Sequence, residues 1–179
     1  GNAFDLPMSF LAVDDLQPGE DPARAVAIAT ANVDNDTGGF DDVLVLVDAP
    51  AALAVHLSNG DGTFTGMPPI DLSLAPMALA TGLFDGDALT DVVIANGQDN
   101  SVSVLQGIGV GLFAPPQVID VGIGPDDVRV ADVDDDGNVD IITANRQGQS
   151  VSVLLGRGDG TFELSLDFRL LGGKRPSVI

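Results

Sequence analysis

Short apolar runs alternate along the chain with clusters of Asp, Gly, Asn and Pro. Runs such as VRVADVD, DIITANR, SVSVLLG and LSLDFRLL are rich in Val, Ile and Leu, and turn-forming residues bound them, which is the pattern of β-strands. No long stretch repeats apolar residues with the 3.6-residue period of a helix, although the Ala-rich segment 23–31 could be misread as one. The pattern therefore predicts an all-β chain.

The same pattern recurs every 49 residues. The segments LAVHLSNGDGTF (53–64), VSVLQGIGVGLF (102–113) and VSVLLGRGDGTF (151–162) align without a gap. Four short antiparallel strands in a period of this length are typical of one β-propeller blade. The sequence predicts a partial β-propeller of about three and a half blades, with its three full repeats at about 24–75, 76–124 and 125–172.

The two ends of the chain resemble pieces of further repeats. Residues 1–12 include FDLPMSFLA, which is typical of the last strand of a preceding blade. Residues 176–179 align with the opening of the third repeat and predict the start of a next blade. Because propellers have about 4–8 blades, we expect a larger propeller, or missing blades that a protein partner or a second copy supplies.

The charge of the chain points to cations as partners. Asp and Glu number 27 against 7 Lys and Arg, which gives a net charge of −20. Such a surface repels phosphate backbones, so nucleic-acid binding is excluded. The absence of Cys and the single His exclude thiolate zinc sites and multi-histidine metal sites. No stretch of 18 apolar residues predicts a membrane-spanning helix.

The third repeat carries the clearest candidate metal site. Carboxylates at Asp132, Asp134, Asp136 and Asp140 occupy loop positions 1, 3, 5 and 9, and the carbonyl of Asn138 can supply position 7. Like charges about 4 Å apart repel by about 4 kcal/mol per pair at an effective dielectric constant of 20. Hard oxygen ligands in a flexible loop favour Ca²⁺ over Zn²⁺ or Cu²⁺. The alternative interpretation is that these residues only form turns.

The second repeat keeps part of this pattern. Asp85, Asp87 and Asp91 remain, but Leu83 replaces the first carboxylate and Ala88 replaces the turn glycine. We expect this site to bind Ca²⁺ weakly or to stay empty.

The first repeat has a loop that is two residues longer. Asn32, Asp34 and Asp36 open the site, and either Asp41 or Asp42 closes it. Asp42 keeps the 49-residue register and is the preferred ligand.

These motifs resemble the FG-GAP/VCBS repeat family, whose calcium-loop blades occur in integrin α-subunit propellers and in bacterial surface proteins. The family loop D-x-D-x-D-G-x-x-D and the later G-x-G-D-G-T-F correspond to residues 132–140 and 156–162. The resemblance covers about residues 24–179 and implies a β-propeller with Ca²⁺ in the loop between the first two strands of a blade. An EF-hand would instead need Glu where this chain has Thr143.

The sequence offers no readable catalytic set. The single His56 aligns with Leu105 and Leu154 on a strand, which favours a packing role. We expect a non-catalytic, calcium-stabilised module that contacts protein in an extracellular, cell-surface or periplasmic assembly. The alternatives are a lectin-like propeller, which the absence of Trp and Tyr disfavours, and a fragment of a propeller enzyme such as a lyase.

Overall fold

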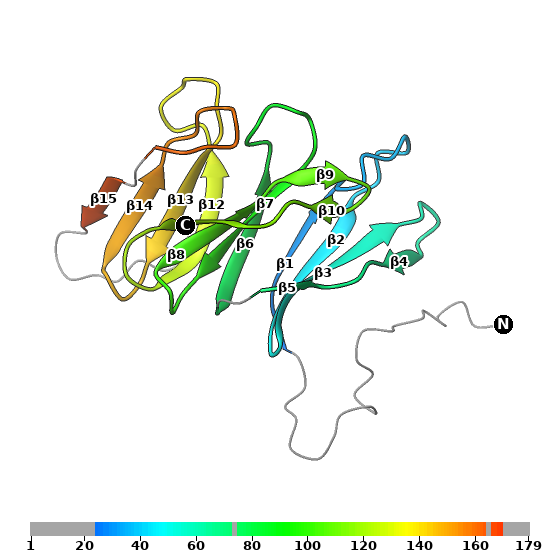
Figure 1. Ribbon diagram of the computed structural model, residues 1–179, viewed down its shortest axis with the longest axis horizontal. Coiled ribbons are helices and arrows are strands. Elements are labelled where there is room, and N and C mark those ends of the chain that lie inside the picture. The colour runs from blue at the N-terminus through cyan, green and yellow to red at the C-terminus, as the bar shows by residue number, and fades with distance from the viewer. Residues whose placement is uncertain (1–23, 73–74, 164–165, 170–179) are drawn as a thin grey trace, which may run out of the picture.

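The computed structural model describes residues 24–72, 75–163 and 166–169, which form strands, turns and loops. Three antiparallel sheets stand side by side (Figure 1), so the predicted all-β fold class is confirmed. Within these residues there is no helix able to cross a membrane. The strand predicted at 1–12 and the blade start predicted at 176–179 lie outside the described residues.

Each sheet lies within one predicted repeat, and we call the sheets blade 1, blade 2 and blade 3 in chain order. Blade 1 contains β1 (Ala25–Ala31), β2 (Asp42–Asp48), β3 (Ala51–Ser58), β4 (Phe64–Gly66) and β5 (Ile70–Asp71). Blade 2 contains β6 (Pro76–Gly82), β7 (Asp91–Asn96), β8 (Ser101–Leu105) and β11 (Gln117–Asp120), with a small hairpin of β9 (Gly107–Gly109) and β10 (Leu112–Phe113). Blade 3 contains β12 (Pro125–Ala131), β13 (Asp140–Asn145), β14 (Ser150–Leu154) and β15 (Leu166–Arg169).

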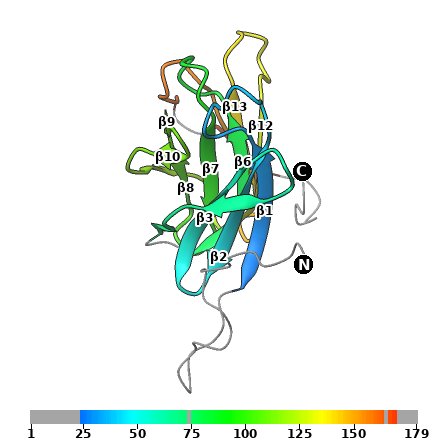
Figure 2. The same ribbon diagram turned by 90° about the vertical axis from the view of Figure 1, so that its right-hand side faces the viewer.

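The strand order is the same in all three blades. The order is β1-β2-β3-β4 in blade 1, β6-β7-β8-β11 in blade 2 and β12-β13-β14-β15 in blade 3. Blades 2 and 3 have the expected four strands, whereas blade 1 has five because β4 and β5 both pair with β3. The first strand of blade 2, β6, contacts the first strands of both neighbours. Figure 2 looks along the row of blades, with blade 1 nearest the viewer.

The apolar core lies between the blades. Every residue of β7 is buried, because this strand packs against blade 1 on one face and against blade 3 on the other. A strand buried on both faces needs a continuous apolar run, which the VVIA segment of β7 supplies. The first core joins blades 1 and 2 through Val33, Leu44, Leu46, Leu53, Val55, Leu79, Val92, Ile94 and Leu105. The second core joins blades 2 and 3 through Phe84, Val93, Ala95, Val102, Val104, Val128, Ile141 and Leu154.

Candidate metal centre

The three acidic loops lie at the same end of the blades. Each loop joins the first strand of its blade to the second, between β1 and β2, β6 and β7, and β12 and β13. All three project from the upper edge of the molecule in Figure 1. The 49-residue repeat therefore places equivalent candidate ligands at equivalent points of successive blades.

A buried aspartate anchors the base of each loop. In blade 2 the carboxylate of Asp91 accepts the backbone N–H of Phe84 at 2.7 Å and that of Gly107 at 2.8 Å. One bond fixes the start of the loop and the other fixes the end of the third strand. The same pair of bonds reaches Asp140 from Val133 and Gly156, and Asp42 from Val33 and Ser58.

In blade 3 the backbone of Gly156 passes so close to that of Val139 that this anchor needs a glycine. A Cβ atom at Gly156 would lie 2.2 Å from the carbonyl oxygen of Val139, so a larger residue could not bring its N–H to Asp140 without a backbone shift.

Burial dominates the electrostatics of the anchoring aspartate of blade 2. The pKa of Asp91 is raised above its ordinary value, chiefly by desolvation and further by the charges of Asp85 and Asp87, against the lowering effect of its two N–H donors. Both oxygens of the carboxylate are already engaged with the backbone. The predicted role of Asp42, Asp91 and Asp140 as metal ligands stays a prediction that depends on their remaining lone pairs.

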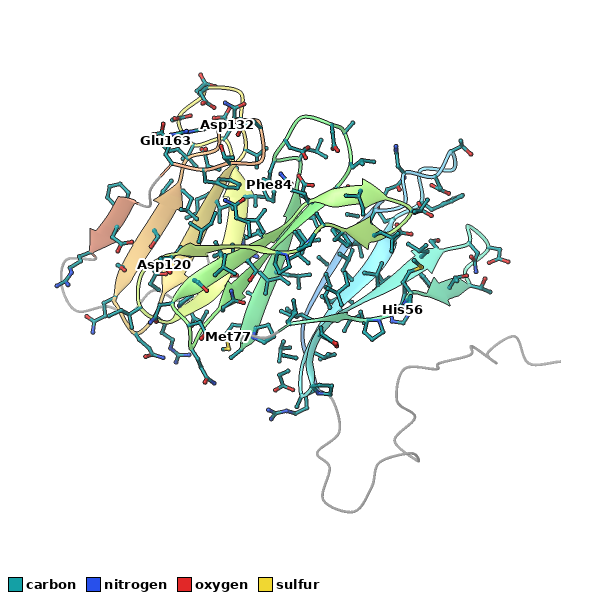
Figure 3. All side chains as sticks on the ribbon, viewed as in Figure 1. His56, Met77, Phe84, Asp120, Asp132 and Glu163 are labelled. Atoms are coloured by element: carbon teal, nitrogen blue, oxygen red, sulfur yellow. The ribbon has the colours of Figure 1, made fainter. Side chains whose placement is uncertain are left out.

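The third loop gathers its other three carboxylates into one cluster. Oxygen atoms of Asp132, Asp134 and Asp136 all lie within 4.8 Å of one another, and all three side chains are exposed. Figure 3 shows Asp132 at the tip of blade 3. Backbone N–H groups orient the cluster: that of Asp136 donates to Asp132 and Asp134 at 3.2 Å each, and that of Gly137 donates to Asp132 at 2.9 Å. No other three acidic or histidine side chains of the described residues meet in this way.

The carboxylates of this cluster differ in their affinity for protons. The pKa of Asp134 is raised by desolvation and by the neighbouring charges of Asp136, Asp140 and Asp132. The pKa of Asp136 is lowered, because the backbone and side-chain amides of Asn138 donate to it at 2.8 and 2.9 Å. Of these two carboxylates, Asp134 is the one whose charged form a bound cation would stabilise more.

The chemistry of the cluster fits a calcium ion. Its three side chains supply only hard oxygen donors, which Ca²⁺ prefers and which suit Zn²⁺ or Cu²⁺ poorly. Their mutual repulsion gives a divalent cation a favourable electrostatic site. Asp132, Asp134 and Asp136 would hold the ion, and Asn138 and Asp140 follow in the same loop as the other predicted ligands.

The second loop keeps its turn geometry without gathering its carboxylates into a triad. The N–H of Asp87 donates to Asp85 at 3.1 Å, and that of Leu89 donates to Asp87 at 2.8 Å. Ala88 has a φ of 66°, in the left-handed region where the third loop has Gly137. The expectation that this site binds weakly or stays empty remains a prediction.

The first loop folds around Asp36. Its carboxylate accepts the N–H of Gly39 at 2.8 Å and the side-chain amide of Asn32 at 3.3 Å. Asp42 begins β2 and is buried, whereas Asp41 is exposed. Asp42 thus occupies the position that the 49-residue register assigns to it. Calcium at Asn32, Asp34, Asp36 and Asp42 remains a prediction.

Each loop also has an apolar residue at its second position, and in blades 1 and 2 this residue packs in the core. Val33 and Phe84 follow the first loop position and are each 2% exposed, because the next blade covers them. The equivalent Val133 is 52% exposed. The sequence does contain a sign of this burial, because all three loops have an apolar residue at their second position. In two of the loops this residue stands between polar neighbours.

Comparisons with known proteins support this fold. Residues 84–143, from the loop of blade 2 into β13, match the model of the FG-GAP-like repeat. No curated protein matches the sequence. Among solved structures, "Crystal structure of BBS1N in complex with ARL6DN, soaked with lead" is similar at a TM-score of 0.55 and 12% identity, over 84% of this chain and 42% of that one. "Structure of Photorhabdus luminescens Tc holotoxin pore, Mutation TccC3-D651A" matches at a TM-score of 0.49 and 19% identity, over 84% and 7%.

The chain spans less than half the length of either solved chain. At 12% identity, the likeness to the BBS1N structure concerns the fold alone. The matched segment contains the whole acidic loop of blade 3. Together with the three repeated antiparallel sheets, this match supports a fold of β-propeller blades in which residues 84–143 are similar to the FG-GAP-like repeat.

Proposed function

We propose that the chain is a calcium-stabilised, non-catalytic module that contacts protein in an extracellular or cell-surface assembly. The observation that carries this proposal is the cluster of Asp132, Asp134 and Asp136 at the tip of a blade. A bound cation would neutralise the cluster and fix the loop between the first two strands. The FG-GAP-like repeat at residues 84–143 and the net charge of −20 support the same role.

The proposed location follows from the strength of such sites. Calcium modules that work outside the cell bind with dissociation constants of about 10⁻⁴–10⁻³ M. We expect the exposed loop with three carboxylates to bind Ca²⁺ with a dissociation constant in the same range. The similar solved structure holds BBS1N in complex with ARL6DN, which supports a protein-contact role for blades of this fold.

Calcium is expected to raise the melting temperature of the chain by about 5–9 °C at 5 mM. A site with a dissociation constant near 10⁻⁴ M adds about 2.3 kcal/mol to the folded state at this concentration, and each kcal/mol raises the melting temperature of a domain of this size by about 2–4 °C. The measurement is thermal unfolding by circular dichroism in EDTA and in CaCl₂, because the chain has no Trp.

The variant Asp134→Asn should lose most of this calcium-dependent rise. Its matched control is Asp135→Asn, which removes one charge from the same loop at a residue outside the cluster. A calcium response that is absent in the wild type, or equal in the two variants, would contradict the proposed site.

The calcium response should also depend on pH. Without an ion, the raised pKa of Asp134 lets the folded state keep a proton at pH values above 3.8, where the unfolded state has lost it. The free energy of unfolding therefore falls as the pH rises from 3.8 through the raised pKa. Calcium displaces this proton, and the calcium-induced rise in melting temperature therefore grows over the same window and is lost below it. Scans between pH 3.5 and 7 (about 0.5 apart) should show this dependence in the wild type and not in Asp134→Asn.

A further inference from the structure

The turn between β3 and β4 presents an Asn-Gly pair to water. Asn59 and Gly60 are both exposed, in the hairpin at the right of Figure 1. The backbone nitrogen that follows an asparagine can attack the carbonyl carbon of the asparagine side chain. A glycine leaves that nitrogen unhindered, because it has no Cβ. This turn therefore holds a reactive pair at the surface of the folded molecule.

We infer that Asn59 deamidates spontaneously in the folded protein. The nitrogen of Gly60 gives its proton to hydroxide and bonds to Cγ of Asn59, and the side-chain nitrogen takes a proton from water and leaves as ammonia. Water then opens the resulting cyclic imide at one of its two carbonyl groups. One opening gives aspartate, and the other gives isoaspartate, in which the backbone runs through Cγ and is longer by one carbon. This inference is independent of the proposed calcium and contact roles.

Exposed hydrogen bonds hold the side chain of Asn59. Its Nδ2 donates to Oγ1 of Thr63 at 2.8 Å, and its Oδ1 accepts from Oγ1 of Thr65 at 3.0 Å. Both threonines are exposed, so water can replace these bonds at little cost. The N–H of Gly60 makes a longer bond, of 3.3 Å, to Oγ of Ser58. The nitrogen and the carbon that react can therefore meet without unfolding of the blade.

The same dipeptide occurs at Asn96 and Gly97, where the fold blocks the reaction. Asn96 is 1% exposed, and its Nδ2 donates to Oγ of Ser101 at 3.1 Å and of Ser103 at 2.9 Å. A Cβ atom at Gly97 would lie 2.6 Å from Cγ of Met77, so the surroundings of this pair are tightly packed. The expected difference between the two pairs thus comes from the fold and not from the dipeptide.

The reaction at Asn59 reaches the first acidic loop through Phe40. A Cβ atom at Gly60 would lie 2.5 Å from Cε2 of Phe40, so this ring covers the backbone beside the reacting residue. Phe40 belongs to the loop between β1 and β2. The N–H of Asn59 closes the turn by donating to the carbonyl of Thr63 at 3.0 Å. An additional backbone carbon at position 59 moves Gly60 from the ring and opens the turn, so isoaspartate loosens the loop.

Peptide mapping of the full chain tests the modification. After incubation in mildly alkaline buffer, peptic peptides are analysed by mass spectrometry with fragmentation, which locates the residue and distinguishes aspartate from isoaspartate. The amide of Asn59 should be replaced by an acid at least about tenfold faster than that of Asn96, because the buried pair must first open. In urea the two rates should become similar. Thr65→Val, which frees Oδ1 of Asn59, should speed the reaction by about two- to fivefold.

Brief digestion with chymotrypsin, which cuts after Phe40, tests the effect on the loop. The aged wild-type chain should be cut there at least about threefold faster than the fresh chain, because the loop opens more often. The matched control is Asn59→Gln, which cannot form the same imide, so ageing should leave its cleavage unchanged.

Equal rates at Asn59 and Asn96 in the folded chain, or a reaction at Asn59 in urea alone, would overturn the inference. Cleavage after Phe40 that ageing does not change, despite isoaspartate at position 59, would overturn its link to the first acidic loop.

Discussion

Replacing Asp91 with alanine is expected to lower the free energy of unfolding by about 3–5 kcal/mol. The change leaves the buried N–H groups of Phe84 and Gly107 without their acceptor, and each unsatisfied group costs about 1–3 kcal/mol. It also releases the start of the loop and the end of β8 from a common anchor. Urea unfolding followed by circular dichroism measures the loss.

Two companion variants make this result specific. Asp91→Asn keeps one carbonyl oxygen as an acceptor, so its loss should lie between wild type and Asp91→Ala. Asp120→Ala removes an exposed carboxylate at the end of β11 and should change the stability by about 0.5 kcal/mol or less. If Asp91→Ala and Asp120→Ala are equally mild, the anchor has no energetic importance.

Replacing Phe84 with alanine is expected to lower the free energy of unfolding by about 3–5 kcal/mol, because it opens a cavity between blades 2 and 3. Phe84 is 2% exposed and belongs to the second core, and its ring contacts that of Phe162. The loss combines the transfer of a buried ring to water with the edge-to-face contact. Chemical unfolding in EDTA isolates this packing effect from the metal loop.

The matched control for this change is Phe168→Ala, because Phe168 is 55% exposed on β15. It should lose well under half as much stability. Phe84→Leu keeps most of the volume and should cost about 1.5 kcal/mol or less. An equal loss for Phe84→Ala and Phe168→Ala would show that the junction of blades 2 and 3 does not depend on the buried ring.

The blades could be predicted from the sequence because their pattern is local and repeated. Alternation of apolar runs with Asp and Gly defines short strands, and the constant period defines the unit. Even the Ala-rich β1 is a strand, since small residues suit the first strand of a blade, which packs close to β6. Tertiary packing thus outweighs the helix propensity of alanine.

The candidate site was only partly accessible from the sequence. The spacing of Asp132, Asp134 and Asp136 predicts convergence, and their oxygens do meet. The spacing could not show that Asp140 faces backbone N–H groups, because a carboxylate before a strand looks the same whether it faces an ion or an amide. The orientation of the Asp140 side chain depends on the N–H of Gly156, which lies sixteen residues further along the chain, just after the third strand β14.

The apolar loop positions were hidden for a different reason. The burial of Val33 and Phe84 cannot be inferred from one blade, because residues of the next blade pack against them. A repeat alignment shows that the position is apolar but not that its neighbour inserts a phenylalanine there. Contacts between repeats require the stacking geometry that the structure provides.

The hydrogen bonds between blades have a direction that matters for biosynthesis. Two backbone bonds run from a turn glycine of the later blade to a loop carbonyl of the earlier one, from Gly111 to Val33 and from Gly160 to Phe84. A ribosome releases the chain from its N-terminus, and repeats can fold as they emerge. At these two junctions the acceptor belongs to the blade that is translated first, so we expect the row to extend in the order of translation.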